Sequence, residues 1–323
     1  MICVIDTTLA CLERYTVSSQ QLAMLLEALI AIKVDYIELT PSIYRKLGTL
    51  NPKGKYILRL SMPGEALQFP EFSRFVCPAR GMSVPNGVTT EVQVNDLREA
   101  YLLRSVRELP SVRITGLDDL LLHDWQEAFV DLRARMAGRV EFCPENQYFC
   151  ATALAVEWVL GGGTDIVTSF GGLGHKAPLE EVLLALRLQA HHKPGNQFSC
   201  FPAMKALIEE ITGQTFPHNK PVIGSNIFHV ESGIHVDGIL KRQQLYEPYF
   251  PELVGSERRF VLGKHSGLQS IRLKLQQNGL NPEAFQLAEL LDAVRGQSID
   301  QQGCVPDDLF LHLAQGYRKE EAI

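Results

Sequence analysis

Short β-branched runs alternate with longer helical patterns over roughly the first 190 residues of this 323-residue chain. In the segment 18–32, Leu22, Leu25, Leu26 and Leu29 fall on one helical stripe, and 118–137 and 147–160 behave similarly. The expected strands are Ile2–Thr7, Val34–Leu39, Lys55–Leu60, Val112–Thr115, Arg139–Cys143 and Asp165–Ser169, with two more placed loosely near Arg74–Cys77 and Val88–Val92. This alternation predicts parallel strands joined by helical crossovers.

The turn after the first predicted strand distinguishes a closed barrel from an open sheet. An open, doubly wound sheet carries a Gly-rich phosphate turn at this point. Here residues 7–10 read Thr-Thr-Leu-Ala, without a glycine. We therefore predict a TIM (β/α)8 barrel over residues 1–190, with the segment 61–95 as its least regular part because four prolines interrupt it.

The composition changes after Leu188. Residues 189–199 are polar and include Pro194 and Gly195, which is typical of a linker. Helical patterns follow at 202–212, 268–278, 282–294 and 306–318. The expected division is therefore a barrel at 1–190 and a C-terminal α-helical region at 191–323.

Bulk properties exclude several classes of protein. A net charge of −6 and a pI near 5.9 argue against nucleic acid or an anionic membrane surface as a partner. The apolar runs are shorter than the roughly 18–20 residues of a membrane span, and the first residues lack the basic start of a signal peptide. The seven cysteines are odd in number and scattered, which favours a reduced, cytoplasmic protein.

Three stretches of the sequence resemble the homocitrate/isopropylmalate synthase family. They are Asp-Thr-Thr-Leu at 6–9, Gly-Leu-Gly at 172–174 followed by Pro-Leu-Glu-Glu at 178–181, and a C-terminal block with Gly-Ser-Asn at 224–226, Glu-Ser-Gly-Ile-His-Val-Asp-Gly at 231–238, Tyr-Glu-Pro at 246–248 and Leu-Gly-Lys-His-Ser-Gly at 262–267. The C-terminal block follows the family in register throughout. The resemblance is strongest to the nitrogen-fixation type of homocitrate synthase and weakest between Lys55 and Ser111, where the barrel looks compacted.

The resemblance implies a lid after the barrel and a Claisen-type acyl transfer from acetyl-CoA to a 2-oxo acid. In such enzymes a divalent metal at the mouth of the barrel holds the oxo acid, and the metal and an arginine stabilise the developing alkoxide. The family members are dimers whose lids reach over the partner's barrel. A homodimer, or a heterodimer with a homologous synthase, is therefore expected.

The first-strand motif departs from the family pattern D-T-T-L-R-D/E-G-E-Q. Ala10 stands where the arginine is expected and Cys11 where a carboxylate ligand is expected, whereas Glu13 is kept as a candidate catalytic residue. The family's H-x-H-N-D pattern, whose two imidazoles face one side of a strand, is replaced by Cys-Pro-Glu-Asn-Gln at 143–147. Residues 171–175 (Gly-Gly-Leu-Gly-His) replace N-G-L-G-E, and residues 115–117 (Thr-Gly-Leu) replace A-D-T.

Two interpretations of the altered metal site are open. Cys11 and Cys143 can pack simply as small hydrophobic residues. Alternatively, Cys11, Cys143 and Glu145 stand where old ligands stood and could form a new site, for which Zn²⁺ is better suited than Mg²⁺ or Mn²⁺. The identity of any metal cofactor is thus not determined by the sequence.

The lid motifs are nearly intact. By resemblance His235 is the base or proton relay that acts on the acetyl group, and Tyr246, eleven positions later, is its partner. The alternative is that these residues only fold the lid. Gly172 and Gly174 are candidates for contact with CoA phosphate, because loops after the last strands of a TIM barrel frequently bind phosphate, although glycines there also simply permit tight turns.

Three hypotheses follow for function. The first is a non-catalytic or impaired homocitrate synthase-like protein that supplies its lid in trans to a partner. The second is an active acyltransferase that uses an altered metal site or no metal, with acetyl-CoA and a 2-oxo acid as substrates. The third, a decaying gene product, is opposed by the intact Leu, Val and Ile periodicity of the helices.

Overall fold

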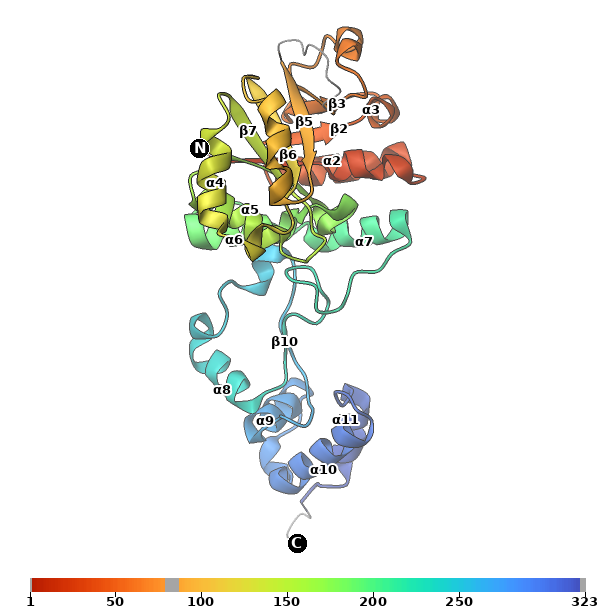
Figure 1. Ribbon diagram of the computed structural model, residues 1–323. Helices are drawn as coiled ribbons and strands as arrows, with labels where there is room; N and C mark the ends of the chain where they lie inside the picture. The colour runs from red at the N-terminus through yellow and green to blue at the C-terminus, as the bar shows by residue number, and fades with distance from the viewer. Residues whose placement is uncertain (1, 79–86, 320–323) are drawn as a thin grey trace. The chain divides into compact units, whose positions relative to one another are not determined.

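The N-terminal part of the computed structural model is a closed parallel barrel (Figure 1), and the structure describes residues 2–78 and 87–319. Strands β1 to β8 pair in chain order, and β8 returns to β1 with Cys3 opposite Asp165 and Asp6 opposite Thr168. The strands are β1 (Cys3–Asp6), β2 (Tyr36–Leu39), β3 (Tyr56–Arg59), β4 (Phe75–Pro78), β5 (Val88–Val94), β6 (Ser111–Gly116), β7 (Arg139–Pro144) and β8 (Asp165–Ser169), followed by the short β9 (Ala177–Pro178). The predicted TIM barrel is confirmed.

Helices lie outside the strands, and local capping explains where they begin. Helix α2 has the predicted buried leucine stripe and starts with a capping box in which Ser18 and Gln21 satisfy each other's backbone N–H groups. The helix expected over 118–137 begins only at Trp125, after Asp124 caps it. The helices of this unit are α1 (Thr8–Cys11), α2 (Ser19–Ala31), α3 (Pro41–Leu47), α4 (Trp125–Ala134), α5 (Ala151–Leu160), α6 (Leu179–Ala190) and α7 (Phe201–Thr212).

The barrel is compacted where the sequence is least regular. The two loosely placed strands are present as β4 and β5. Apart from these strands, the described residues between β3 and β6 form only two 3-10 helices, η2 (Pro63–Gln68) and η3 (Leu97–Ser105). Part of the predicted irregular segment, residues 79–86, lies outside the described residues. Short turns in place of full crossover helices account for the small size of this barrel.

The compact N-terminal unit extends beyond residue 190, to Phe216, and includes residues 221–223. The segment that the sequence analysis grouped with the linker packs against barrel elements. The Asn196 amide donates to the Ile32 carbonyl over 2.9 Å, and the rings of Phe198 and Phe201 stack with centroids 5.1 Å apart. These contacts attach α7 to the barrel.

The second compact unit comprises residues 217–220 and the chain from Gly224 onward. Its elements are β10 (His229–Val230), α8 (Gly233–Arg242), η6 (Gln243–Leu245), η7 (Pro251–Val254), β11 (Arg259–Phe260), α9 (Leu268–Gln277), η8 (Pro282–Ala284), α10 (Leu287–Asp300) and α11 (Asp307–Gln315). Leu275, Leu290 and Phe310 are fully buried in its core, so the three predicted C-terminal helices pack together. Among the described residues, none of the helices is both long and apolar enough to cross a membrane.

Candidate functional site

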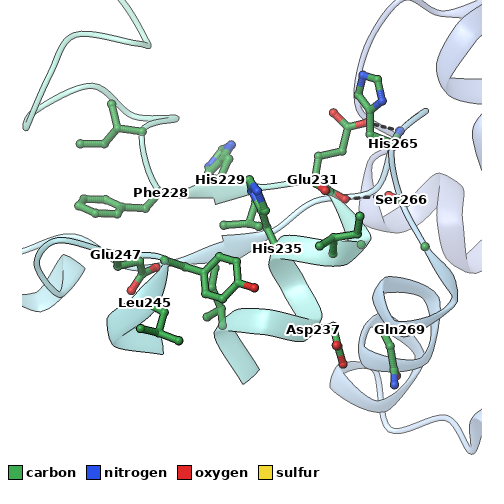
Figure 2. Close-up of a pocket in the computed structure, with 18 of the residues that line it drawn as sticks. Phe228, His229, Glu231, His235, Asp237, Leu245, Glu247, His265, Ser266 and Gln269 are labelled. Atoms are coloured by element: carbon green, nitrogen blue, oxygen red, sulfur yellow. Dashed lines mark hydrogen bonds between the residues drawn. The ribbon is translucent and has the colours of Figure 1, made fainter. Parts of the chain in front are cut away.

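The C-terminal unit contains a cavity of about 1340 Å³, which we call the lid pocket. Figure 2 shows His229 of β10 and His235 of α8 pointing into it. The ring centroids of His235 and Tyr246 lie 5.7 Å apart in an edge-to-face arrangement. The structure therefore brings together the two residues that the lid motifs predicted as a pair.

Gly238 explains how Tyr246 comes so close to helix α8. A Cβ atom at position 238 would lie 2.0 Å from the Tyr246 ring, so with any larger residue the ring would have to move away from its observed place. Tyr246 nevertheless remains 42% exposed, and His235 is also exposed. Both side chains are thus positioned by the helix but open to an incoming group.

A hydrogen-bonded turn forms one wall of the lid pocket. The Glu231 carboxylate accepts from the His265 backbone N–H over 2.8 Å (Figure 2). The Ser266 hydroxyl accepts from the Gly263 N–H over 2.9 Å. From α10, the Arg295 guanidinium donates to the Ser266 carbonyl over 2.7 Å. These bonds fix the Gly263–Gly267 turn independently of any ligand.

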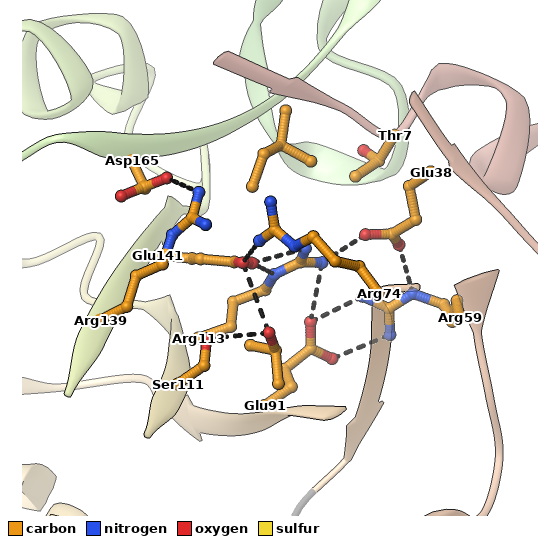
Figure 3. A network of polar contacts seen from close by, with 12 residues as sticks. Thr7, Glu38, Arg59, Arg74, Glu91, Ser111, Arg113, Arg139, Glu141 and Asp165 are labelled. Atoms are coloured by element: carbon orange, nitrogen blue, oxygen red, sulfur yellow. Dashed lines mark hydrogen bonds and ion pairs between the residues drawn. The ribbon is translucent and has the colours of Figure 1, made fainter. Parts of the chain in front are cut away.

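The barrel interior holds a buried network of ion pairs (Figure 3). The fully buried Arg113 of β6 donates to Glu38 of β2 over 2.5 Å and to Glu141 of β7 over 2.9 Å. Arg59 of β3 connects Glu38 to Glu91 of β5, with 2.6 Å to each carboxylate. Burial alone would raise the pKa of Glu38, but the guanidinium groups of Arg113 and Arg59 outweigh it and hold that pKa below its ordinary value.

A smaller cavity of about 180 Å³ in the barrel unit, the mouth cavity, is lined in part by residues of this network. Its described lining consists of Thr7, Ala10, Cys11, Glu38, Arg59, Glu91, Gln93, Arg113, Thr115, Cys143, Val167 and Lys176. The Lys176 ammonium lies 3.0 Å from the Glu145 carboxylate. Burial alone would lower the pKa of Lys176, but the Cys143 thiolate that forms at high pH and the Glu145 carboxylate outweigh it and hold that pKa above its ordinary value. Lys176 was not predicted as the cation of this site.

The donors at the mouth do not suit a divalent metal. Burial raises the pKa of Cys143, and it raises that of Cys11 to about 11, so both are neutral thiols at pH 7. The Glu145 carboxylate is already paired with Lys176. Within residues 2–78 and 87–319, no group of three or more His, Cys, Asp and Glu side chains could hold a metal ion. As the described residues are placed, Cys11, Cys143 and Glu145 do not form such a group, and a metal site at these three residues stays a prediction.

The remaining predicted barrel residues lie at the edge of the site. Glu13 is exposed, accepts from the Thr40 hydroxyl over 3.0 Å and does not line the mouth cavity. Gly172 and Gly174 have φ angles of 78° and 66°, which glycine adopts without strain, and they line a pocket of about 220 Å³ with Arg14 and His175. The catalytic role of Glu13 and the contact of the glycines with CoA stay predictions.

The glycine loop already holds an anionic group of its own. The Gly171 backbone N–H donates to the Glu180 carboxylate over 2.8 Å, at the start of helix α6. A helix N-terminus is the position at which a barrel of this kind would hold a phosphate. Here the Glu180 carboxylate occupies the Gly171 N–H of the loop, and the contact of CoA phosphate with Gly172 and Gly174 stays a prediction.

Asp6 gives the barrel a pH-dependent stability. It is fully buried and accepts from the Thr8 N–H and hydroxyl, each over 2.9 Å. Burial raises its pKa from 3.8 to about 7, against the lowering effect of the Thr8 hydrogen bonds. The folded protein therefore binds this proton more tightly than the unfolded chain does. The resulting stabilisation is present below about pH 4 and is lost as the pH rises through 7.

We expect the free energy of unfolding to fall less between pH 5 and pH 8 in Asp6→Asn than in the unsubstituted protein. Urea unfolding of both proteins at the two pH values measures this difference. The other titrating groups are common to both proteins, so the difference isolates Asp6. An equal pH dependence in the two proteins would show that the Asp6 carboxyl is not perturbed.

Comparisons with known proteins agree with these features. Residues 222–302 match the family described as homocitrate synthase post-HMGL domain-like. The chain is 30% identical over 239 residues to the homocitrate synthase omega subunit of Clostridium pasteurianum, an alignment that covers 72% of this chain and 68% of that protein. It is 37% identical over 188 residues to homocitrate synthase 1 of Nostoc sp., covering 57% of this chain and 49% of the relative, so it spans about half of that protein's length.

The fold also has known structural relatives. Hydroxymethylglutaryl-CoA lyase from Pseudomonas aeruginosa superimposes with a TM-score of 0.51 at 15% identity, covering 66% of this chain and 94% of the lyase. At this identity the likeness concerns the fold alone. The sequence matches carry the assignment: this chain belongs to the homocitrate and isopropylmalate synthase family.

Proposed function

We propose that this protein does not catalyse condensation in its own barrel and instead supplies its lid in trans to the barrel of a homologous synthase. The observation that carries the proposal is the contrast between the two units. The barrel mouth has Ala10 in place of the expected arginine and the ammonium of Lys176 among neutral thiols. The lid pocket keeps His235 beside Tyr246.

The chemistry that each unit can offer supports this division. Condensation requires a group that stabilises negative charge on the ketone oxygen and a base that removes a proton from the acetyl methyl group. In the mixed dimer the partner's barrel provides the first, and the imidazole of His235 accepts the proton. Tyr246 packs edge-to-face against His235 and holds its ring in position.

Exposed apolar side chains around the lid pocket support a protein partner. Ile234 is 78% exposed, Leu245 70% and Leu268 47%, and all three line the pocket. Clustered apolar exposure of this kind marks interaction surfaces. The relative from Clostridium pasteurianum is named as a subunit, which supports an assembly of different chains. The partner we propose is a homologous barrel that retains its metal ligands.

The proposal is tested by co-expression with such a homologue and purification through a tag on this chain. CoA release is then measured with acetyl-CoA and 2-oxoglutarate, pyruvate or 2-oxoisovalerate. We expect co-purification, and we expect His235→Ala to lower kcat of the complex by about 10²–10⁴-fold, the usual contribution of a general base. His312→Ala, an exposed histidine of α11 outside the lid pocket, is the matched control and should leave kcat unchanged.

Two results would contradict the proposal. The first is that the two chains do not co-purify and that the activity of the homologue is unchanged by the presence of this chain. The second is CoA release at ordinary enzymatic rates by this chain alone, which would establish the alternative of an active acyltransferase with an altered metal site or none. Metal analysis of the same sample separates those two forms of the alternative.

A further inference from the structure

We infer that the barrel unit binds a nucleoside diphosphate in a second cavity, far from the mouth. This cavity, which we call the base cavity, is formed by residues within 100–108 and 134–137 and has a volume of about 480 Å³. The inference concerns the barrel unit alone and does not depend on the proposed role of the lid. It rests on the position of the cavity, the rigidity of its walls, three arginines, and a size and apolar surface that suit an aromatic base.

The base cavity lies at the end of the barrel opposite to the mouth. Residues 104–108 come shortly before β6, residues 134–137 come shortly before β7, and these two strands are parallel. The mouth cavity instead contacts Thr115 and Cys143, near the ends of the same strands. The two cavities share no lining residue among the described residues, so a ligand of the base cavity occupies a separate site.

The backbone fixes the walls of the base cavity. The Ala137 N–H donates to the Arg107 carbonyl over 2.9 Å, which ties the segment after α4 to the segment after η3. Just beyond this bond, a Cβ atom at Gly138 would lie 2.4 Å from the carbonyl oxygens of Leu109 and Pro110. The two backbones are therefore in close contact, and the cavity is formed before a ligand arrives. A preformed site binds its ligand without the cost of ordering the walls.

Three guanidinium groups of the cavity retain hydrogen-bond donors. Within the described part of the chain, Arg104 makes no ion pair and no side-chain hydrogen bond. Arg107 donates to Glu108 through Nε alone, over 2.9 Å. Arg135 donates to Asp131 through Nε over 2.7 Å and lies 2.5 Å from it through Nη2. A guanidinium carries five N–H donors, so Nη1 of each arginine is available to a ligand, and the charge of Arg104 is not balanced.

The existing ion pairs do not prevent these arginines from meeting a phosphate. Arg107 and Glu108 are 63% and 75% exposed, and Arg135 and Asp131 are 46% and 49% exposed. Exposed pairs of this kind are weak because water screens them. Phosphate carries more charge than one carboxylate and accepts two parallel bonds from a guanidinium. Since the chain as a whole has a net charge of −6, the attraction must come from this local group of arginines.

The size and the apolar surface of the cavity select an organic phosphate. A volume of about 480 Å³ lies within the roughly 300–1,000 Å³ of small-molecule sites, so inorganic phosphate would leave much of it unfilled. Leu103 and Met136 line the cavity and are 1% and 8% exposed. A methionine sulfur packs well against aromatic rings, and a guanidinium stacks on them. A flat base that carries phosphate groups fits both kinds of wall.

The test is isothermal titration of the full chain with guanosine diphosphate in magnesium-free buffer. Adenosine diphosphate is avoided because it is part of CoA. We expect saturable binding of one nucleotide per chain, at least tenfold weaker binding to Arg104→Met, and several-fold weaker binding to Arg107→Met. Arg98→Met is the matched control, because Arg98 is an exposed arginine of the same helix η3 that does not line the cavity; it should bind the nucleotide normally.

Two further ligands separate the parts of the inference. Guanosine lacks the phosphates and pyrophosphate lacks the base, and each should bind at least tenfold more weakly than the nucleotide. The inference is overturned if guanosine diphosphate does not bind, if either fragment binds as tightly, or if Arg104→Met binds no more weakly than Arg98→Met. Circular dichroism checks that each variant is folded. If Arg104→Met does not fold, Arg107→Met decides: weaker binding supports the inference, and unchanged binding contradicts it.

Discussion

The Arg113→Met variant is expected to lose about 3 kcal/mol of the free energy of unfolding, the lower end of the range for breaking a buried ion pair. Arg113 is fully buried and lies between the carboxylates of Glu38 and Glu141. Methionine fills much of the same volume, but it removes the positive charge that Arg113 places beside both carboxylates. The loss stays near the lower end because Glu38 keeps Arg59 and Glu141 keeps Arg74.

Urea unfolding followed by far-UV circular dichroism measures this loss. Arg135→Met is the matched control, because Arg135 makes a surface ion pair with Asp131 in which both side chains are nearly half exposed. Exposed pairs of this kind contribute about 0–1 kcal/mol, so the control should differ little from the unsubstituted protein. Equal stabilities of the two variants would show that the network in Figure 3 adds nothing to the fold.

The strands of the barrel could be predicted because they are buried on both faces. Their short β-branched runs differ from the helical patterns around them, and β8 has the predicted bounds Asp165–Ser169 and is buried throughout. The helix expected over 147–160 begins instead at Ala151, where the Asn146 side chain accepts from the Ala151 N–H. The positive φ of Phe149 interrupts the helical pattern just before that point. Such boundaries depend on local capping and backbone geometry that periodicity does not report.

The ionic network was not predicted, although the sequence contains a signal for it. Glu38, Arg59, Glu91, Arg113 and Glu141 each stand within one of the strands predicted from the sequence. In a barrel whose outer face is covered by helices, such charges must point inward and find partners there. Which carboxylate pairs with which arginine depends on the register between strands, and the sequence alone does not give that register.

The candidate site could be predicted only where a sequence motif marks it. The pairing of His235 with Tyr246 followed from the resemblance, and the glycine at 238 that permits it lies in the same motif. Lys176 had no such motif. Its position at the mouth results from a β-bridge to Glu145, thirty-one positions earlier in the chain, and from the distances in the folded barrel.

The Gly233→Ala variant should destabilise the lid unit by about 2–3 kcal/mol, as overpacking against a rigid neighbour does. Gly233 is the first residue of α8, and a Cβ atom there would lie 2.7 Å from both Cα and N of Gly267. Because both contacts are to backbone, the helix and the Gly263–Gly267 turn must move apart, and His235 moves with the helix. Hydrogen exchange of the α8 and α9 amides measures the effect as faster exchange.

Whether amide exchange becomes faster or slower distinguishes a steric clash at position 233 from an effect of helix propensity. Alanine is a better helix former than glycine by about 0.8–1 kcal/mol, so propensity alone predicts that Gly233→Ala would slow exchange. Gly296→Ala in α10 is the matched control, because a Cβ atom there meets nothing within 4 Å, and it should slow exchange. Gly267→Ala meets Gly233 at 3.2 Å and should have an intermediate effect. Slower exchange in Gly233→Ala would mean that the two backbones do not touch, and that the lid turn does not set the position of His235.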